Sequence, residues 1–187
     1  GNVERLVGIP GSVGGMLVMN AGTHLGWIQD LVQSVELLRK ENSKWIEIQY
    51  VPEAKDWTYR SALFVRPGDI LIGATLKFSK LDPAYLEKKI KQLYDRRKET
   101  QPVDQPSCGS VFKNPKEHNL QAWQVMEKLG LRGFRVGDAQ FSEKHSNFIV
   151  NLGNAKAKDI EELIQTARTK ARVELGIELI PEVQKLK

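Results

Sequence analysis

The sequence predicts an α+β fold in two regions that meet near residue 81. Alternating apolar strands dominate the first region, and amphipathic helices with recognisable start and stop signals dominate the second. Of the 187 residues, 41% are hydrophobic, which is enough to build two small cores. A helix start signal at Asp82 follows the last predicted strand of the first region. We therefore expect regions 1–81 and 82–187.

Composition and charge exclude several classes of function. The net charge is +5, and the one clear basic cluster lies between Lys88 and Lys98, so a small anionic ligand explains the balance and no nucleic acid is expected. No apolar run approaches the length of a membrane span, and the first residues lack the layout of a signal peptide. One cysteine, which cannot form an internal disulfide, suits a reducing cytoplasm. Three scattered histidines and one cysteine predict no metal site.

A glycine-rich segment opens the chain. Its sequence is Gly8-Ile9-Pro10-Gly11-Ser12-Val13-Gly14-Gly15. Glycines at these spacings permit positive φ angles, and a loop of this kind that leads into a short helix at 12–19 can hold a phosphate. The spacing is neither that of a Rossmann loop nor that of a P-loop. The alternative is a glycine turn that lets a helix of small residues pack closely.

Strands follow at 32–39, 45–50 and 70–78, and Asn42-Ser43 occupies a hairpin position between the first two. Between the second and third strands lies Tyr59-Arg60-Ser61, an arginine flanked by two hydroxyl groups. Arg60 is either solvated, which is the default for a surface arginine, or points inward to pair with an anion.

Asp82-Pro83 is a strong helix start, because Asp caps the helix and Pro fits its first position. An apolar stripe then continues in register onto Arg97 and Lys98; its members are Leu86, Ile90, Leu93 and Tyr94. Two cations on an inward stripe would require an anionic partner. The alternative is that the helix frays after Asp95 and leaves both cations in solvent.

Residues 101–115 combine prolines at 102, 106 and 115 with varied polar groups. The prolines and Gly109 keep the backbone out of a helix around the apolar pair Val111-Phe112. The polar groups are those of Cys108, Ser110, Lys113 and Asn114. Such a loop indicates a functional site, and the alternative is a stiff linker between two lobes. Cys108 has no histidine partner in the sequence, and we interpret it as a loop residue.

The rest of the chain predicts a helix around 122–129 that ends at Gly130, short strands at 139–141 and 148–150, and a helix at 157–175 that ends at Gly176. Residues 178–184 predict an edge strand, because Pro181 cannot donate to a ladder. His145 lies in a polar turn, where a lone histidine is more often structural than catalytic. Glu182 is by default a solvated carboxylate.

Five motifs in this order resemble the UDP-N-acetylenolpyruvoylglucosamine reductases (the MurB family), in the shorter subclass without insertions. They are the glycine-rich segment with Asn20-Ala21-Gly22, Tyr59-Arg60-Ser61, the segment 109–115, Lys144-His145-Ser146-Asn147-Phe148-Ile149-Val150-Asn151, and Pro181-Glu182-Val183. Together they cover nearly the whole chain.

The resemblance implies a fold, an activity and a set of site residues. Residues 1–81 would be the remaining half of a PCMH-type FAD-binding α+β domain, and 82–187 a C-terminal substrate-binding domain. The activity would be the FAD- and NADPH-dependent reduction of UDP-N-acetylglucosamine enolpyruvate in the bacterial cytoplasm, for peptidoglycan synthesis. The resemblance assigns catalysis to Arg60, Ser110 and Glu182, substrate binding to Tyr59, Arg97, Lys98 and Asn114, and FAD binding to Gly8, Ile9, Pro10, Gly11, Ser12, Gly14, Gly15, Asn20, Ala21 and Gly22.

The implied chemistry explains the three catalytic residue types. Hydride transfer to the terminal carbon of the enolpyruvyl group leaves an enolate, whose charge Arg60 would offset. Glu182 could do so only as a protonated carboxyl group, a form that burial beside an anion favours. Ser110 would then deliver a proton to carbon, with its position compensating for its weak acidity.

The sequence departs from the family pattern in two places. The family begins with a further N-terminal lobe that supplies phosphate contacts, so the chain resembles a C-terminal portion, with that lobe as a partner. We therefore expect these residues alone to bind FAD weakly and to expose an apolar patch at Ile9, Val13, Leu17 and Val18. The alternative function is a non-catalytic fragment that binds a UDP-sugar without flavin. Trp27 stands where many family members carry an acidic residue, and the sequence offers no interpretation of it.

Overall fold

The chain folds as two compact units, Gly1–Tyr94 and Asp95–Lys187, each of mixed helices and strands. The computed structural model describes residues 2–185. Each unit has a hydrophobic core of its own. The predicted α+β class is confirmed. The predicted boundary at residue 81 lies just before helix α2 (Pro83–Thr100), whereas the two units divide within that helix.

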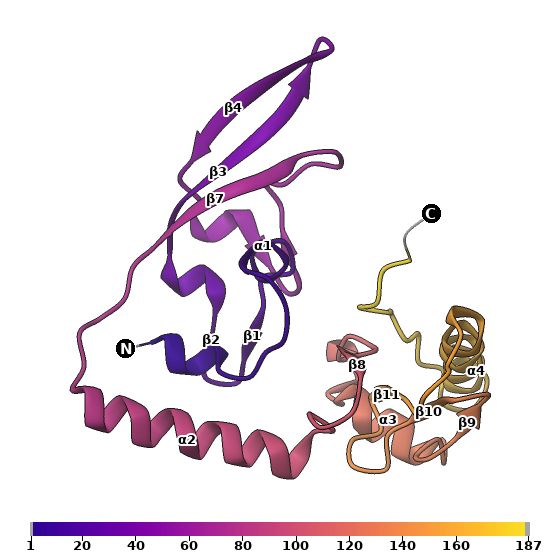
Figure 1. Cartoon of the computed structure of the whole chain (residues 1–187). Coiled ribbons are helices and arrows are strands. Elements are labelled where there is room, and N and C mark those ends of the chain that lie inside the picture. Colours follow the sequence, from indigo (N-terminus) through magenta and orange to yellow (C-terminus); the bar gives the residue numbers. More distant parts are fainter. Residues whose placement is uncertain (1, 186–187) are drawn as a thin grey trace. The chain divides into compact units, whose positions relative to one another are not determined.

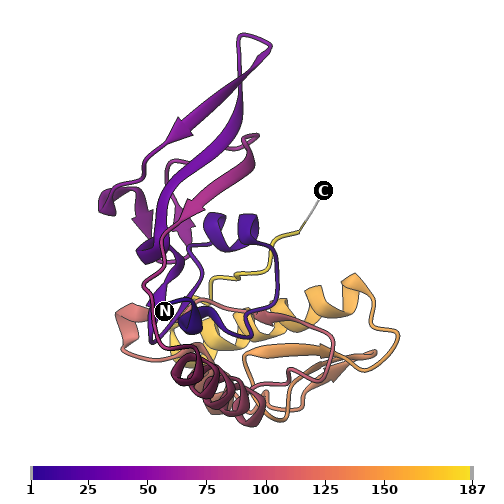
Figure 2. The same cartoon turned by 60° about the vertical axis from the view of Figure 1, so that its left-hand side comes forward.

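The sheet of the first unit has the strand order β4-β3-β7 and is antiparallel (Figure 1). Its strands are β3 (Val32–Glu41), β4 (Lys44–Tyr50) and β7 (Ile70–Leu76), which confirms the three predicted strands. Asn42 and Ser43 both have left-handed φ angles, 48° and 66°, and join β3 to β4 as a two-residue turn. The β3–β4 turn extends beyond the end of β7 (Figure 2), because β7 pairs with β3 only as far as Leu38.

One face of this sheet covers the core of the first unit. Val35 and Leu37 alternate toward that core and are fully buried. Two short hairpins lie beneath, one formed by β1 (Gly22–Thr23) and β2 (Gly26–Trp27), the other by β5 (Trp57–Thr58) and β6 (Ser61–Ala62). Short 3-10 helices connect these pieces; they span Val3–Leu6, Ile28–Leu31 and Ala54–Asp56. The buried core residues are Leu6, Leu17, Ile28, Leu31, Val35, Leu37, Trp57 and Ala62.

Helix α1 (Val13–Val18) confirms the predicted helix after the glycine-rich segment. The position of α1 determines which side chains of the expected apolar patch are exposed. Leu17 is 1% exposed and belongs to the core, so its predicted exposure is wrong, because the helix packs this side chain beneath the sheet. Val13 and Val18 are 52% and 37% exposed, as expected.

Helix α2 begins where the sequence predicts. The carboxylate of Asp82 accepts a hydrogen bond of 2.8 Å from the backbone N–H of Tyr85. The helix continues without interruption to Thr100, so the alternative of fraying after Asp95 is wrong. All of Pro83–Thr100 is described, and none of its side chains is buried.

The second unit contains an antiparallel sheet of order β8-β11-β10-β9. Its strands are β8 (Ser107–Ser110), β9 (Arg135–Val136), β10 (Ala139–Phe141) and β11 (Phe148–Asn151). Part of the predicted loop at 101–115 is therefore a strand, and Cys108 and Ser110 lie on it rather than in a loop. A 3-10 helix at Lys116–His118 follows.

Helices α3 (Ala122–Lys128) and α4 (Ala157–Leu175) pack with this sheet around the core of the second unit. Gly130 and Gly176 have left-handed φ angles, 63° and 66°, and end the two helices as predicted. After α3, the N–H of Leu131 donates a hydrogen bond to the carbonyl of Met126. The side chain of Leu131 is buried beside the helix. The largest core side chains are Phe112, Phe141, Met126, Leu131, Leu163 and Leu179.

The predicted edge strand at 178–184 is wrong in its extent. This segment makes only an isolated antiparallel bridge, between Phe112 and Pro181. Two backbone hydrogen bonds flank the bridge, from Lys113 to Ile180 at 2.9 Å and from Glu182 to Val111 at 2.8 Å. Phe112 and Pro181 are a non-hydrogen-bonded pair, so the nitrogen of Pro181 faces away from this ladder and the proline costs it no bond.

Candidate active site

The glycine-rich segment has the backbone that its sequence predicts. Gly8 and Gly11 have φ angles of 72° and 134°, which side chains rarely allow. A Cβ on Gly11 would meet no atom within 4 Å, so the backbone is open to a ligand there. The Ser12 hydroxyl accepts the N–H of Gly15 at 3.1 Å and caps α1. An exposed loop of this kind fits a phosphate group of a cofactor.

Asn20 and Gly22 have clear structural roles in the first unit. Asn20 is 1% exposed, and its amide donates to Gln29 Oε1 at 2.6 Å and to the carbonyl of Thr58 at 3.0 Å. A Cβ on Gly22 would lie 2.7 Å from the carbonyl oxygen of Gly26, so only glycine lets β1 and β2 pair this closely. Asn20 thus ties the β1–β2 region to the β5–β6 hairpin. The Oδ1 of Asn20 is buried and accepts no hydrogen bond, so a contact with a cofactor could use this oxygen or the backbone. The predicted FAD contacts of 20–22 stay predictions.

Arg60 occupies a two-residue turn, with Tyr59, between β5 and β6. Thr58 pairs with Ser61 across this turn, and Arg60 has a left-handed φ of 60°. Its guanidinium carbon lies 5.0 Å from the ring centroid of Tyr59 and 5.5 Å from that of Trp27. The two rings meet edge to face at 5.7 Å. Two aromatic rings therefore contact the guanidinium with cation–π geometry, and its Nη1 is buried, which favours the inward orientation over the solvated one; pairing of Arg60 with an anion stays a prediction.

Trp27 is a residue that reasoning from the sequence missed. Its neighbours in the chain give no sign that it meets Arg60, which lies 33 positions later. The local sequence, Leu25-Gly26-Trp27-Ile28, carries no signal that would have found this contact.

Arg97 and Lys98 differ, although the sequence predicts the same inward stripe for both. Arg97 is half-buried, and its Nη1 donates to Gln101 Oε1 at 3.2 Å. Burial lowers the pKa of the Arg97 guanidinium from its ordinary value. Lys98 is exposed, so its inward placement is wrong: it lies one position past the stripe. Its backbone carbonyl accepts a hydrogen bond from Lys144 Nζ at 3.1 Å.

Ser110 and Glu182 come together on neighbouring segments of the second unit. Ser110 is half-buried at the end of β8, opposite Phe148 of β11. Glu182 is also half-buried, and its N–H donates to the carbonyl of Val111, the residue after Ser110. The backbone of Glu182 is thus paired with the residue that follows Ser110, although Ser110 and Glu182 are 72 positions apart in sequence.

Asn114 and Cys108 lie close to Ser110 in sequence. Asn114 Oδ1 accepts the N–H of Ala122 at 2.9 Å, so this exposed residue fixes the start of α3. Cys108 is exposed on β8. Neither observation tests the predicted contact of Asn114 with substrate.

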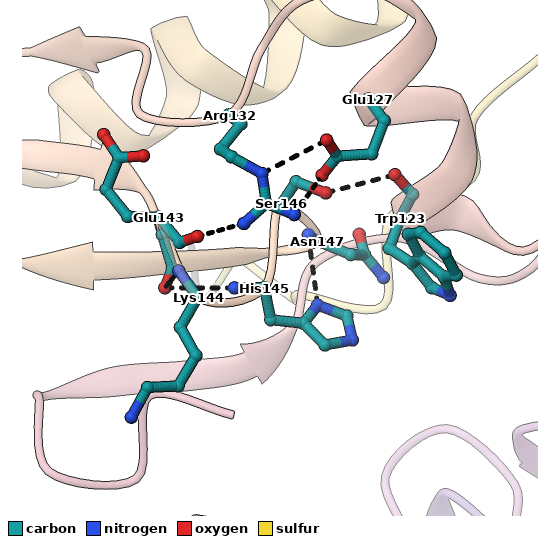
Figure 3. A network of polar contacts seen from close by, with 9 residues as sticks. Trp123, Glu127, Arg132, Glu143, Lys144, His145, Ser146 and Asn147 are labelled. Atoms are coloured by element: carbon teal, nitrogen blue, oxygen red, sulfur yellow. Dashed lines mark hydrogen bonds and ion pairs between the residues drawn. The ribbon is translucent and has the colours of Figure 1, made fainter. Parts of the chain in front are cut away.

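A network of polar contacts fixes the turn between β10 and β11 (Figure 3). The Arg132 guanidinium contacts Glu127 and donates to the carbonyl of Glu143, and the Ser146 hydroxyl donates to the carbonyl of Trp123 at 3.1 Å. These bonds attach the turn to α3 and to the segment after it. The turn therefore has the fixed geometry that a site-forming loop requires.

His145 lies within this turn. Its Nδ1 accepts the N–H of Asn147 at 3.3 Å, and its ring packs edge to face on Phe148 at 4.8 Å. Burial lowers the pKa of the His145 imidazole, which favours the neutral form that can accept this bond. These contacts agree with the structural interpretation of His145.

Two surface depressions of about 260 and 360 Å³ lie along β3 and β4 in the first unit. Both include Arg39 and Arg66, and neither includes a predicted site residue. Within residues 2–185, no helix is long and apolar enough to cross a membrane. The same residues contain no group of three or more His, Cys, Asp or Glu side chains that could hold a metal ion.

Comparisons with known proteins identify relatives of the chain. The sequence profile described as UDP-N-acetylenolpyruvoylglucosamine reductase, C-terminal domain, matches residues 101–186. The reductase of Thermotoga petrophila is 40% identical over 184 residues, which are 98% of this chain and 63% of that protein. The reductase of Nostoc sp. is 41% identical over 184 residues, which are 98% of this chain and 54% of that protein.

A solved structure agrees with these sequences. The crystal structure of the reductase MurB from Thermus caldophilus matches with a TM-score of 0.81 and 37% identity, over 98% of this chain and 64% of that one. The chain spans about 60% of the length of the relatives it matches. These findings give no support to the alternative of a UDP-sugar-binding fragment without catalytic function. Residues 101–186 match the C-terminal domain of the UDP-N-acetylenolpyruvoylglucosamine reductases, and the chain as a whole is similar in sequence and fold to these reductases.

Proposed function

We propose that the protein containing this chain reduces UDP-N-acetylglucosamine enolpyruvate to UDP-N-acetylmuramate for peptidoglycan synthesis, with FAD and NADPH, in the cytoplasm. Similarity to the reductases in sequence and fold supports this activity. The observation that supports the site is the hydrogen bond from Glu182 to Val111, because it pairs the backbone of Glu182 with the residue that follows Ser110 within one unit. A proton donor and a carboxyl group in one place suit the reduction of an enolpyruvyl double bond.

Residues of the first unit fit a flavin diphosphate in part. The open backbone at Gly8 and Gly11 fits a phosphate, and Ile9, Pro10, Ser12, Gly14 and Gly15 complete the loop. The amide nitrogen of Asn20 is used internally, whereas its buried Oδ1 accepts no hydrogen bond, so 20–22 would contribute backbone contacts and this side-chain acceptor. When bound, FAD supplies the hydride, which it takes from NADPH.

The chain's own residues handle charge and protons. Arg60 binds the substrate carboxylate and offsets the negative charge that develops there; its aromatic neighbours fix its guanidinium before substrate arrives. Glu182, as a protonated carboxyl group, donates a hydrogen bond to the same developing charge. Ser110 gives its hydroxyl proton to the enolate carbon, and its place at the end of a paired strand limits its motion.

Substrate binding uses a second set of residues: Tyr59, Arg97, Lys98 and Asn114. Of these two cations, Arg97 contributes more to substrate binding. Solvent screens the attraction of its half-buried guanidinium for an anion less than that of the exposed ammonium of Lys98. A guanidinium also matches the two oxygens of a phosphate.

The test separates the two half-reactions in the protein that contains this chain. Ser110→Ala should leave flavin reduction by NADPH near its normal rate and slow reoxidation by the enolpyruvyl substrate by roughly 10²–10⁴, the range for a positioned general acid. Stopped-flow absorbance of the flavin measures both steps. Ser107→Ala, at an exposed position on the same strand, is the matched control and should change neither.

Equal losses in both half-reactions of Ser110→Ala would assign Ser110 a structural role. A wild-type protein that carries flavin but is not reoxidised by the substrate would refute the proposed activity. Residues 1–187 expressed alone should bind FAD weakly, because the glycine-rich loop supplies only part of the hydrogen bonds that a diphosphate requires. The visible spectrum of the purified chain measures this, and stoichiometric flavin would contradict it.

A further inference from the structure

Asn147 is a buried polar residue to which the proposed mechanism gives no role. It lies at the end of the β10–β11 turn, directly before β11, and is 3% exposed. A buried amide must pair its donor and acceptor groups or destabilise the fold. The partners that it pairs with therefore indicate its function.

Three of the four hydrogen bonds of Asn147 go to the two residues that follow Ser110; the fourth is the one from its N–H to His145 Nδ1. The carbonyl of Asn147 accepts the N–H of Val111 at 2.8 Å. Its side-chain Oδ1 accepts the N–H of Phe112 at 3.0 Å, and its Nδ2 donates to the carbonyl of Phe112 at 3.0 Å. The side chain thus pairs with Phe112 as a neighbouring strand would, with one donor and one acceptor.

The opposite edge of the same two residues holds the segment that contains Glu182. Phe112 forms the bridge with Pro181, and the carbonyl of Val111 accepts the N–H of Glu182. Two backbone hydrogen bonds flank this bridge, and the segment depends on them for its attachment to Val111-Phe112. Val111-Phe112 is therefore a shared support, with Asn147 on one edge and Glu182 on the other.

We propose that Asn147 is a positioning residue that sets Ser110 and Glu182 together, through Val111-Phe112. This rests on the proposed function for the catalytic roles of Ser110 and Glu182. If the amide is removed, Phe112 loses both of its partners on that edge, and the two side chains lose their fixed relation. A displacement of about 1 Å at a reacting group can cost about 10²-fold in rate.

Two variants and one control isolate this effect. Asn147→Ala removes both side-chain bonds. Asn147→Asp keeps the acceptor for the Phe112 N–H but turns an oxygen toward the Phe112 carbonyl. Asn151→Ala is the control, because Asn151 Oδ1 also accepts two hydrogen bonds, from Gly153 at 2.8 Å and Ala155 at 3.0 Å, and contacts neither Val111 nor Phe112.

The kinetic test uses the flavin-loaded protein that contains this chain. In both Asn147 variants we expect reoxidation by the enolpyruvyl substrate to slow by about 10²-fold with its full amplitude, and its solvent deuterium isotope effect to rise as proton delivery becomes limiting. Flavin reduction by NADPH and the Asn151→Ala control should be unchanged. A merely structural role would lower the amplitude, through a smaller folded fraction, and leave the rate constant and isotope effect as in wild type; that result would overturn the proposal.

Amide hydrogen exchange tests the physical link independently of activity. In Asn147→Ala, the amides of Phe112 and Glu182 should both exchange faster, while that of Ala167, in the core of α4, stays protected. Faster exchange at Phe112 with unchanged exchange at Glu182 would overturn the link to Glu182. A wild-type protein that is not reoxidised by the substrate would refute the proposed function, and with it the catalytic part of this inference, whatever the exchange result.

Discussion

The two units hold their proposed catalytic side chains in different ways. In the first unit, Arg60 lies in a two-residue turn at a left-handed φ and is held by the rings of Trp27 and Tyr59. In the second unit, Ser110 and Glu182 are held by backbone pairing and by one buried amide. A turn residue depends on its side-chain neighbours, whereas a paired residue depends on the sheet and the core beneath it.

The hydrophobic cores of the two units also differ, and the core of the second unit is the larger. Of the described residues, fifteen buried side chains form the core cluster of the second unit and eight form that of the first. The first unit also exposes large apolar side chains on β4 and β7, including Trp45 at 51% and Ile72 at 48%. We therefore expect the second unit to keep its site geometry more strongly than the first.

The largest expected effect is the loss of unfolding free energy when a core side chain is removed from one unit or the other. Phe141→Ala in the second unit should cost about 3–5 kcal/mol of unfolding free energy, and Leu37→Ala in the first about 2–5 kcal/mol, because both side chains are fully buried. Each variant should shift only the transition of its own unit. Urea denaturation followed by tryptophan fluorescence resolves this, since Trp123 reports on the second unit and Trp27, Trp45 and Trp57 on the first.

Trp123→Phe serves as the control that removes the signal of the second unit. A single transition in which both variants shift both units equally would show that the two cores unfold together.

The next effect compares two adjacent cations. Arg97→Gln should weaken substrate binding by roughly 10-fold or more, the range for a hydrogen bond to a charged group, whereas Lys98→Gln should change it by about two- to threefold. The half-buried Arg97 should keep its effect at high salt, and the effect of exposed Lys98 should disappear there. Titration calorimetry with substrate at low and high ionic strength measures both.

Arg96→Gln is the matched control, at an exposed position on the same helix. If neutralising Arg97 and Arg96 gave the same small change, the substrate anion would lie elsewhere.

The pH dependence of stability should also distinguish the units. The hydrogen bond from Arg39 lowers the pKa of Asp69 in the first unit, so this contribution is present above the unfolded pKa and is lost as the pH falls through the folded one, in strong acid. Burial lowers the pKa of His145 in the second unit. Protonation of His145 therefore favours the unfolded state. As the pH falls, the second unit should begin to lose stability near the ordinary pKa of histidine, at a higher pH than the first unit.

Urea denaturation at pH 7.5 and pH 5.5 measures this difference. His145→Gln should reduce the loss between these two values in the second unit and leave the first unchanged. A loss of equal size in the variant would assign the pH dependence to other groups.

Much of the fold follows from local signals in the sequence. The Asp82 cap and the left-handed Gly176 mark the start of α2 and the end of α4, because each acts within one turn of its helix. The strands of the first unit follow from alternation, and the turn at Asn42-Ser43 from residues that tolerate positive φ.

The errors concern contacts between residues far apart in sequence. The placement of Lys98 is a local exception: it lies one position past the stripe, and helical rotation leaves it exposed beside half-buried Arg97. The sequence of 178–184 predicts a strand, but in the fold this segment pairs with residues 111–113 at a single bridge. Asn147 and Trp27 could not be assigned, because their partners lie 35 and 33 positions away and only the folded chain brings them together.

The smallest expected effect tests the weaker of the two arrangements, the aromatic support of Arg60. Trp27→Leu removes one of the two rings that the guanidinium contacts, and keeps an apolar side chain against Gly22. A cation–π contact of this kind contributes about 0.5–2 kcal/mol, so substrate affinity should fall by roughly two- to thirtyfold, with little change in flavin reduction. Trp27→Phe should restore most of the affinity, because a ring remains. Trp45→Leu, at an exposed position in the same unit, is the control. Substrate titration measures the affinity, and the NMR shift of the Arg60 guanidinium, which an adjacent ring displaces, reports the contact. If Trp27→Leu left both readouts as in wild type, Tyr59 and the β5–β6 turn alone would hold Arg60, and the first unit would fix its site through the backbone, as the second does.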